Sequence, residues 1–312
     1  MAEIRPTRYS SELQRLIFPD NSFYKKSIGE SGVADKTERV EKPVQTKISK
    51  AKEGTPSSLP LAVETTTDTT KYYNTTLIYC APLLIDSQSE MLVNYNKRAT
   101  KQMQQADEIN TKVAAYILGK WCPTKKDNIL KTTGDARDSG VAGINSQRKR
   151  VTKEDLIRVL NTALRMGVSG LGGNWYGMVT PDMYTDLLSI PDYTDYFKTG
   201  NESKLKEGIV GRILGIDIFC RTVDEGHSGV LYNGSMTPIS GDSEVKDTCY
   251  TGGLFWNDKL VCRAEGTLRT VVNANAPGYL GGTIIESFVR CGADIVRDDQ
   301  KGVIALLEDK TA

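Results

Sequence analysis

The chain has 312 residues, enough for one large domain or two modest ones with a substantial buried core. It carries 40 lysines and arginines against 39 aspartates and glutamates, a formal net charge of +1. This balance argues against a protein held to nucleic acid by global electrostatics, so any contact with DNA would be local.

Cysteine and histidine usage argues against a structural zinc site. The chain has six cysteines without a Cys-x-x-Cys pair, and His227 is its single histidine. Residues 1–6 lack the apolar block of a signal peptide, so we expect the cysteines to remain thiols in a reducing cytoplasm. The longest apolar run, residues 77–85, contains Pro82 and is far shorter than the ~20 residues of a membrane-spanning helix, so we expect no membrane segment.

The first segment, residues 1–43, is rich in charge and broken by prolines and glycines, and its hydrophobic residues are scattered. Such a segment cannot bury enough apolar surface by itself to offset its chain entropy. We expect an arm that is ordered by a neighbouring subunit. A disordered tail is the alternative.

From residue 44 the sequence changes to strand patterns. Val44, Thr46 and Ile48 alternate with polar residues, a turn rich in glycine and proline follows, and residues 65–79 are rich in threonine and tyrosine. Together they predict a long hairpin over residues 44–85 with little apolar content toward its tip. Because a two-stranded hairpin is marginal in water by itself, we expect another copy of the chain to support it.

A capping box, Ser87-x-x-Glu90, opens the next element, and apolar residues recur at steps of three and four as far as Ile117. The pattern predicts an amphipathic helix of about eight turns within residues 86–120, with Gly119 as its C-cap. Its polar face should stay in water or meet a neighbour.

A loop over residues 123–150 leads to a second capped helix, from Thr152-x-x-Asp155 through Met166, with Gly167 ending it. The side chains expected to point inward are Leu156, Val159, Leu160, Ala163 and Leu164.

The next stretch begins with a strand that ends at Val179 and leads into a helix. Thr180 is the expected N-cap of that helix and Pro181 its first residue, where a missing N–H costs nothing. Residues 208–218 read as one strand punctuated by three glycines.

The last third of the chain is predicted to be mostly sheet. Short strands are expected around residues 229–232, 253–256 and 260–264, and alternation marks 270–276, 282–291 and 303–307. The chain is therefore expected to be α+β, with the early helix packed on a sheet built largely from the last third.

No constellation of catalytic residues stands out. A nucleophile and base would need His227, which lies in a turn-rich loop and is interpreted as a surface residue. Residues 170–175 invite comparison with a dinucleotide fingerprint, but Trp175 replaces the third glycine and the run precedes a strand. Asp298 and Asp299 are interpreted as solvated turn carboxylates. We predict no catalytic, cofactor-binding or metal-binding residues.

Two other clusters have structural interpretations. The basic triplet at residues 148–150 is the densest candidate for a DNA phosphate contact, but a solvated loop is the favoured interpretation. Strand and helix packing explain a possible aromatic stripe without a ligand. The stripe consists of Tyr72, Tyr73, Tyr79 and Tyr95.

The order of these elements resembles the major capsid proteins of tailed phages, which share the Hong-Kong-97-type fold. The most specific segments are Val179-Thr180-Pro181-x-x-Tyr184-x-x-Leu187-Leu188 and Gly208-x-x-Gly211-Arg212-x-x-Gly215-x-x-Ile218. The resemblance extends over essentially the whole chain. It implies an N-terminal arm (1–43), an extended hairpin or E-loop (44–85), the spine helix of a peripheral domain (86–120), an axial domain (121–243) and a return to the peripheral sheet (244–312).

The resemblance implies self-assembly into the hexamers and pentamers of an icosahedral phage head that encloses double-stranded DNA. The protein would be assembled in the host cytoplasm and reside in the virion, without catalytic activity. The implied partners are other copies, a portal, scaffolding or decoration proteins, and packaged DNA through weak non-specific contact, with no membrane. Two alternatives stay open: an encapsulin-like compartment, and a cytosolic enzyme with an unrecognised site.

Two finer features are conceivable from the resemblance. Some members of the family join subunits by a Lys–Asn isopeptide bond, and the candidate partners here are Lys47, Lys50, Lys52, Asn273 and Asn275. The loop over residues 226–247 is either a decoration site or a tolerated insertion, and the insertion is favoured.

Overall fold

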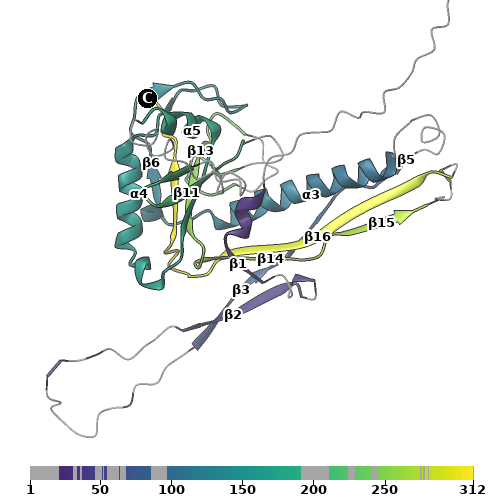
Figure 1. Cartoon of the computed structure of the whole chain (residues 1–312), viewed down its shortest axis with the longest axis horizontal. Coiled ribbons are helices and arrows are strands. Elements are labelled where there is room, and N and C mark those ends of the chain that lie inside the picture. Colours follow the sequence, from purple (N-terminus) through teal and green to yellow (C-terminus); the bar gives the residue numbers. More distant parts are fainter. Residues whose placement is uncertain are drawn as a thin grey trace, which may run out of the picture.

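A compact body carries a long extended part on one side and a projecting hairpin in the computed structural model (Figure 1). The structure describes residues 21–30, 34–35, 37–45, 51, 53–54, 63, 68–85, 97–190, 211–223, 229–239, 245–274, 276, 278–279 and 281–311. Helices and strands are mixed along the chain, as the α+β prediction requires.

The compact body is built on a seven-stranded mixed sheet with the strand order β10-β11-β9-β13-β17-β6 and with β12 paired to β13. Its central strands are almost entirely buried because side chains pack on both faces. The strands are β6 (Ile129–Lys131), β9 (Trp175–Val179), β10 (Gly211–Ile213), β11 (Ile216–Cys220), β12 (Leu231–Tyr232), β13 (Tyr250–Asn257) and β17 (Val303–Leu307). A small ribbon, β7 (Ala136–Arg137) with β8 (Arg148–Lys149), lies beside it.

Helices α4 (Lys153–Arg165) and α5 (Pro181–Leu188) pack on one face of this sheet. Both predicted caps are confirmed: the Thr152 side chain accepts a hydrogen bond from the Asp155 amide in a reciprocal capping box, and that of Thr180 accepts one from Met183. Gly167, with a φ of +69°, follows the end of α4 as predicted.

Leu164 was expected to point into the core, and this expectation is wrong. Its side chain is 60% exposed, whereas Leu156, Val159 and Ala163 are buried and Leu160 is half-buried. At about 100° per residue, Leu164 lies about 80° around the helix from Leu156, beside the exposed Ile157. The step of four residues therefore carries it off the buried face.

The extended part consists of a second sheet and the long helix α3 (Lys97–Trp121). Its longest strand, β16, alternates so that one face packs under α3, which confirms the expected helix-on-sheet arrangement. The strands are β1 (Ile28–Gly29), β4 (Thr76–Tyr79), β5 (Leu83–Ile85), β14 (Val261–Glu265), β15 (Arg269–Asn273) and β16 (Thr283–Ile295).

Helix α3 does not end where the sequence predicted. It continues past Gly119 to Trp121, because Leu118 and Trp121 are both fully buried and packing holds the last turn in place. The capping box at Ser87 and Glu90 lies outside the described residues. None of the helices in the described ranges is long and apolar enough to cross a membrane.

Residues 211–220 form a hairpin, so the prediction of a single strand is wrong. Strands β10 and β11 are antiparallel, with Ile213 opposite Ile216, and Leu214 and Gly215 form a two-residue turn with φ of +48° and +85°. Two-residue turns of this kind need positive φ at both positions, which glycine adopts readily and leucine does not. Because the first turn position holds a leucine, and not the glycine, asparagine or aspartate typical of such turns, the sequence pattern did not predict the turn.

Replacing Gly215 with alanine is expected to destabilise the subunit by about 1–2 kcal/mol, because the side chain would have to adopt a left-handed conformation. Leu214→Gly, which relieves the other left-handed position, should leave the free energy of unfolding unchanged or higher. Urea unfolding of the unassembled subunit measures both. Equal stability of Gly215→Ala and the parent would contradict the turn geometry.

Part of the predicted hairpin is paired, but the pairing begins before residue 44. Residues 76–79 and 83–85, which were also predicted to belong to the hairpin, form β4 and β5 and pair with β16 in the second sheet. Strand β2 (Arg39–Gln45) pairs antiparallel with β3 (Asp68–Asn74), and Arg39 lies opposite Asn74. The remainder of the hairpin toward its tip falls largely outside the described residues.

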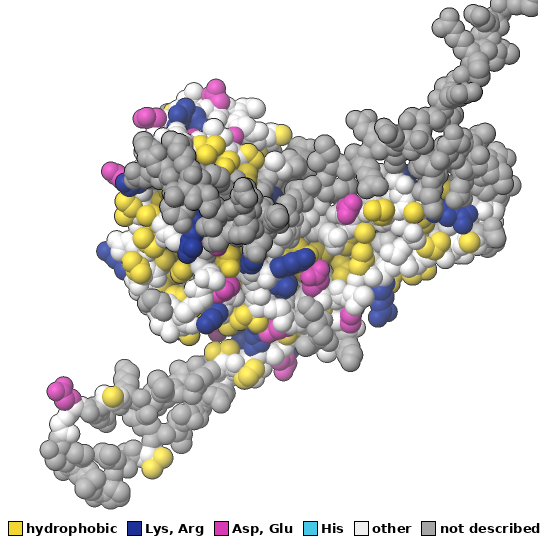
Figure 2. All heavy atoms as spheres, viewed as in Figure 1, with side chains coloured by type: hydrophobic (Ala, Val, Ile, Leu, Met, Phe, Trp, Pro, Cys, Tyr) yellow, Lys and Arg dark blue, Asp and Glu magenta, His cyan; other side chains and the backbone are white. Residues whose placement is uncertain are grey.

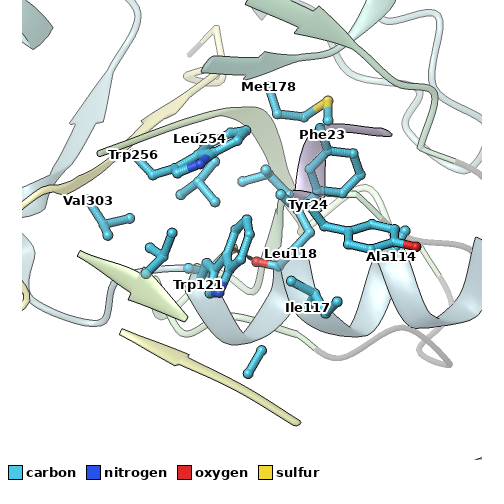
Figure 3. Close-up of a cluster of buried hydrophobic side chains, with 14 of the residues drawn as sticks. Phe23, Tyr24, Ala114, Ile117, Leu118, Trp121, Met178, Leu254, Trp256 and Val303 are labelled. Carbon is cyan, nitrogen blue, oxygen red and sulfur yellow. Dashed lines mark hydrogen bonds between the residues drawn. The ribbon is translucent and has the colours of Figure 1, made fainter. Parts of the chain in front are cut away.

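Residues 21–30 of the predicted arm pack against their own subunit, so for them the expectation of order supplied by a neighbour is wrong. Phe23 and Tyr24, in the short helix η1 (Ser22–Lys25), lie beside Trp256, Trp121 and the end of α3 (Figure 3). Phe23 is fully buried. One short 3₁₀ turn directs both rings inward without a periodic pattern that the sequence would reveal. Residues 1–20 lie outside the described residues.

Two other short helices complete the described elements. They are η2 (Lys126–Asn128), before β6, and η3 (Val168–Leu171), between α4 and β9.

Candidate assembly surfaces and the contacts that position them

An aromatic cluster joins the compact body to the extended part. Trp256 of β13 lies at its centre, with ring centroids 5.6 Å from Trp121 of α3, 6.2 Å from Phe23 and 6.0 Å from Tyr176. Both indole N–H groups donate to carbonyl oxygens, that of Trp121 to Cys262 and that of Trp256 to Lys26. Large buried aromatic surfaces with satisfied polar atoms fix the orientation of the two parts.

Two arginines, the buried Arg221 and the half-buried Arg263, hold residues 21–27 across this junction. The Arg221 guanidinium donates to the Asn21 side chain and, at 3.0 Å, to the carbonyl of Thr111 in α3. That of Arg263 donates to the carbonyl of Tyr24 and the hydroxyl of Ser27, each at 2.8 Å. These contacts therefore fix residues 21–27 on their own subunit.

The base of the β2–β3 hairpin is fixed by two lysines. The Lys42 ammonium lies 2.8 Å from a carboxylate oxygen of Glu30, whose other oxygen accepts a hydrogen bond from the Tyr73 hydroxyl at 2.6 Å. The Lys71 ammonium lies 3.1 Å from Asp294 and 3.2 Å from Asp298. These contacts set the direction in which the hairpin projects (Figure 1).

Burial and hydrogen bonding shift the pKa values of Tyr73 and Lys42 at the hairpin base. Burial, together with the bond to Glu30, raises the pKa of the Tyr73 hydroxyl, so it remains a donor. Burial by itself would lower the pKa of Lys42, but the interactions with Glu30 and Cys262 together outweigh it and the pKa is raised. Lys42 is therefore charged over the physiological range.

The second sheet exposes an apolar face opposite α3. Tyr79 lies across from Phe288 and Leu84 across from Ile284 in the strand register. Tyr79 is 70% exposed. The edge strand β15 has every residue exposed and carries three β-branched residues, which leaves a sheet edge and a half-buried apolar face available to another chain.

A cluster of basic and acidic side chains lies beneath α5, with Asp186 and Glu308 buried and Arg137 and Asp182 half-buried. The Arg137 guanidinium donates to both carboxylate oxygens of Asp186, at 3.0 and 3.2 Å, lies 3.3 Å from Asp182 and pairs with Glu308. Glu308 is fully buried and also accepts a hydrogen bond from Thr251 at 3.1 Å. One cation therefore ties β7, α5 and the end of β17 together.

Burial raises the pKa of Glu308 above its ordinary value of 4.5, although Arg137 and Thr251 act in the opposite direction. This cluster was not predicted from the sequence. Two signals were available: Asp182 and Asp186 are four residues apart on one helix face, and Glu308 directly follows the apolar strand β17.

The basic triplet at residues 148–150 is not a solvated loop, so that interpretation is wrong. Arg148 is fully buried, and its guanidinium donates to the carbonyls of Asp247 at 3.0 Å and Cys249 at 3.1 Å. The ammonium of Lys149 lies 3.1 Å from Asp309. The three residues do not present one basic surface.

The structure separates the tyrosines that the sequence grouped. Tyr73 is packed as expected, but Tyr72 and Tyr79 are 52% and 70% exposed. The Arg39 guanidinium lies 3.5 Å from the centre of the Tyr72 ring, a cation–π contact at the hairpin surface. Tyr95 lies outside the described residues.

Asp298 and Asp299 differ from simple solvated carboxylates because both are paired. A hydrogen bond from Arg297, opposed by burial, lowers the pKa of Asp299 to about 2. Asp298 lies at the ammonium of Lys71.

Several residues singled out by the sequence fall outside the described part of the chain, namely His227, Lys47, Lys50, Lys52 and Asn275. Asn273 is described and is exposed at the end of β15. Within the described ranges, no group of three or more histidine, cysteine or acidic side chains is arranged to hold a metal ion.

The two-part architecture, with a spine-like helix on a long sheet, a compact second sheet and a projecting hairpin, is the fold of phage capsid structures. The chain is similar to the "Capsid of Ralstonia phage GP4" with 13% identity and a TM-score of 0.70, covering 99% of this chain and 96% of that one. It is similar to the capsid of cyanophage P-SCSP1u with 15% identity and a TM-score of 0.66, covering 99% and 94%.

The mature capsid of bacteriophage PhiM1 gives 14% identity and a TM-score of 0.64, covering 98% of this chain and 92% of that one. No protein-family profile matches the sequence, and no curated protein matches it. The fold that the sequence resemblance implied is confirmed, and it is confirmed across nearly the whole length of the chain.

Proposed function

We propose that this chain is the major capsid protein of a tailed bacteriophage, assembling into the hexamers and pentamers of an icosahedral head that encloses double-stranded DNA. The observation that carries the proposal is the likeness to phage capsids over nearly the full length of both chains, including the extended part as well as the compact body. The role is structural and not enzymatic, and its place is the virion.

The exposed features of the subunit support assembly. The two-stranded hairpin is marginally stable in isolation, and the second sheet leaves the edge of β15 and an apolar face uncovered. Contact between copies would stabilise the hairpin and cover the sheet. The unpaired backbone groups would gain hydrogen-bond partners, and the exposed apolar surface would be removed from water. Weak contacts repeated many times then stabilise a shell.

Each proposed domain has its own role in assembly. Residues 1–43 act as an arm whose inner end is fixed on its own subunit, 44–85 as the extended hairpin, and 86–120 as the spine helix. Residues 121–243 form most of the axial domain, and β13 and β17 complete its sheet. The strands β14, β15 and β16 return to the peripheral sheet. A portal, scaffolding or decoration proteins, and DNA held by weak non-specific contact are the further partners.

Expression of the full chain, alone and with its phage's other head proteins, tests the proposal. Negative-stain microscopy should show discrete shells tens of nanometres across. Particles purified from phage-producing cells should contain nuclease-protected DNA. Shells that enclose a cargo enzyme would favour an encapsulin-like compartment instead, and a small oligomer under every condition would contradict the proposal.

A further inference from the structure

Two lysines lie directly opposite each other in the β2–β3 hairpin. Lys42 of β2 is the register partner of Lys71 of β3, and two positions along the ribbon Val40 is the partner of Tyr73. Because side chains two residues apart share a face, all four lie on one side of the ribbon. Like charges directly opposite each other destabilise a strand pair, so the two lysines need negative charge from outside the hairpin.

The rest of the subunit supplies this negative charge through three carboxylates, Glu30, Asp294 and Asp298, which we call the carboxylate cradle. The Lys42 ammonium lies 2.8 Å from Glu30. The Lys71 ammonium lies 3.1 Å from Asp294 and 3.2 Å from Asp298. The two lysine side chains are only 15% and 19% exposed, so the ribbon is seated on the cradle and its charge repulsion is compensated there.

One side of the cradle is held in place independently of the hairpin. Asp298 lies in the turn between β16 and β17, where Arg297 donates to both carboxylate oxygens of Asp299, at 2.9 and 2.7 Å. The Gln300 side chain in the same turn accepts hydrogen bonds from two backbone amides beyond the end of α3, each at 3.0 Å. The turn is therefore a fixed support on which the hairpin rests.

The lysine pair lies where the hairpin leaves the body. On its inner side Val40 and Tyr73 are buried, and on its outer side Pro43 and Thr70 are exposed. Figure 1 shows the ribbon projecting away from the body, and Figure 2 shows basic and acidic side chains together at the junction. A change in these ionic contacts would therefore act on the direction of the ribbon.

The two kinds of contact at the hairpin base respond differently to ionic strength. Salt screens the attraction between partly exposed charges, and the Asp298 side chain is 79% exposed. Burial of Val40 and Tyr73 does not depend on charge, so it persists when the ions are screened. The apolar pair can therefore serve as a pivot while the lysine contacts open.

We propose that Lys42 and Lys71, seated on the carboxylate cradle, form a releasable electrostatic latch. Closed, the latch holds the hairpin in its observed direction. Open, it lets the ribbon swing about Val40 and Tyr73, and the repulsion between the two uncompensated lysines favours closing again. This conformational device goes beyond the proposed function and belongs to the single subunit, so its failure in unassembled protein would leave the proposed function standing.

Electron–electron spin distances in the unassembled subunit test the latch. p-Azidophenylalanine replaces the exposed Thr70 on the hairpin and the exposed Ile157 on α4, and each is coupled to a nitroxide. In low salt the parent should give one narrow distance distribution. Lys71→Met should add a displaced population about tenfold larger than in the parent, the effect of losing roughly 1.5 kcal/mol of charged hydrogen bonding. In 1 M NaCl the parent should shift in the same direction, and Lys71→Met should respond less.

Arg39→Met is the matched control, because it removes one cation from the opposite face of the same ribbon and should keep the parent distribution. If Lys71→Met failed to fold, Asp298→Asn, at an exposed position, should show the same displacement in smaller measure. A broad distribution in the low-salt parent would overturn the latch. So would a parent-like distribution in the variants at the cradle, an equal displacement in Arg39→Met, or a salt response undiminished in Lys71→Met.

Discussion

Replacing Arg137 with methionine is expected to destabilise the unassembled subunit by about 3–5 kcal/mol, the cost of leaving buried charges without their partner. Among the residues that the structure describes, its guanidinium is the one cation that contacts Asp182, Asp186 and Glu308 together. Without it, three carboxylates remain close together beneath α5 and at the end of β17. Urea unfolding followed by far-UV circular dichroism measures the change in the free energy of unfolding.

The destabilisation caused by Arg137→Met should decrease as the pH is lowered. Burial raises the pKa of Glu308 above 4.5, and removing Arg137 removes the main interaction that lowers it. The folded state then binds a proton more tightly than the unfolded chain, so Glu308 favours folding below the unfolded pKa and this contribution is lost as pH rises through the folded pKa. The destabilisation by Arg137→Met should be largest near neutral pH and should shrink as pH falls toward 4.5.

Glu308→Gln is the matched control for this charge cluster. Arg137 keeps both oxygens of Asp186 and the nearby Asp182, and the amide can still accept from Thr251. Since the cost of burying an ionised carboxylate is removed, the change should stay within about 1 kcal/mol. If Glu308→Gln lowered the free energy of unfolding more than Arg137→Met did, the proposal that Arg137 is the essential member of the cluster would be contradicted.

The parts of this fold that the sequence predicted are those decided by local chemistry. Thr152 with Asp155, and Thr180 with Pro181, mark helix starts because capping acts within a few residues. The alternation along β16 follows from one face lying under α3. The order of elements carried the resemblance to phage capsids, and solved structures confirm the fold.

The parts that the sequence did not predict depend on distant segments. Arg148 and Arg137 are ordinary polar residues until carbonyls and carboxylates from other elements surround them, so no local pattern predicts that Arg148 is buried and Arg137 half-buried. The same holds for Leu214 in its turn, whose positive φ is imposed by the pairing of β10 with β11. Long-range contacts override local preference at these positions.

Replacing Phe23 with alanine is expected to destabilise the unassembled subunit by about 3–5 kcal/mol, the usual cost of removing a buried phenylalanine. The ring is fully buried, and it contacts Trp256 at the junction of the two parts of the molecule. The Trp256 environment should become more polar, so tryptophan emission in the folded state should shift to the red. Equilibrium unfolding and fluorescence measure the two effects.

Ile28→Ala is the matched control on the same segment, because Ile28 is 39% exposed in β1, and its change should stay within about 0.5 kcal/mol. If Phe23→Ala left the isolated subunit as stable as the parent while weakening only assembled shells, residues 21–30 would take their order from neighbouring copies after all. The arginines argue against that outcome, since Arg221 and Arg263 bind this segment from elements of the same chain. Under the proposed function, an arm anchored in this way would start from a fixed origin, so less conformational entropy would be lost when its outer part bound a neighbour.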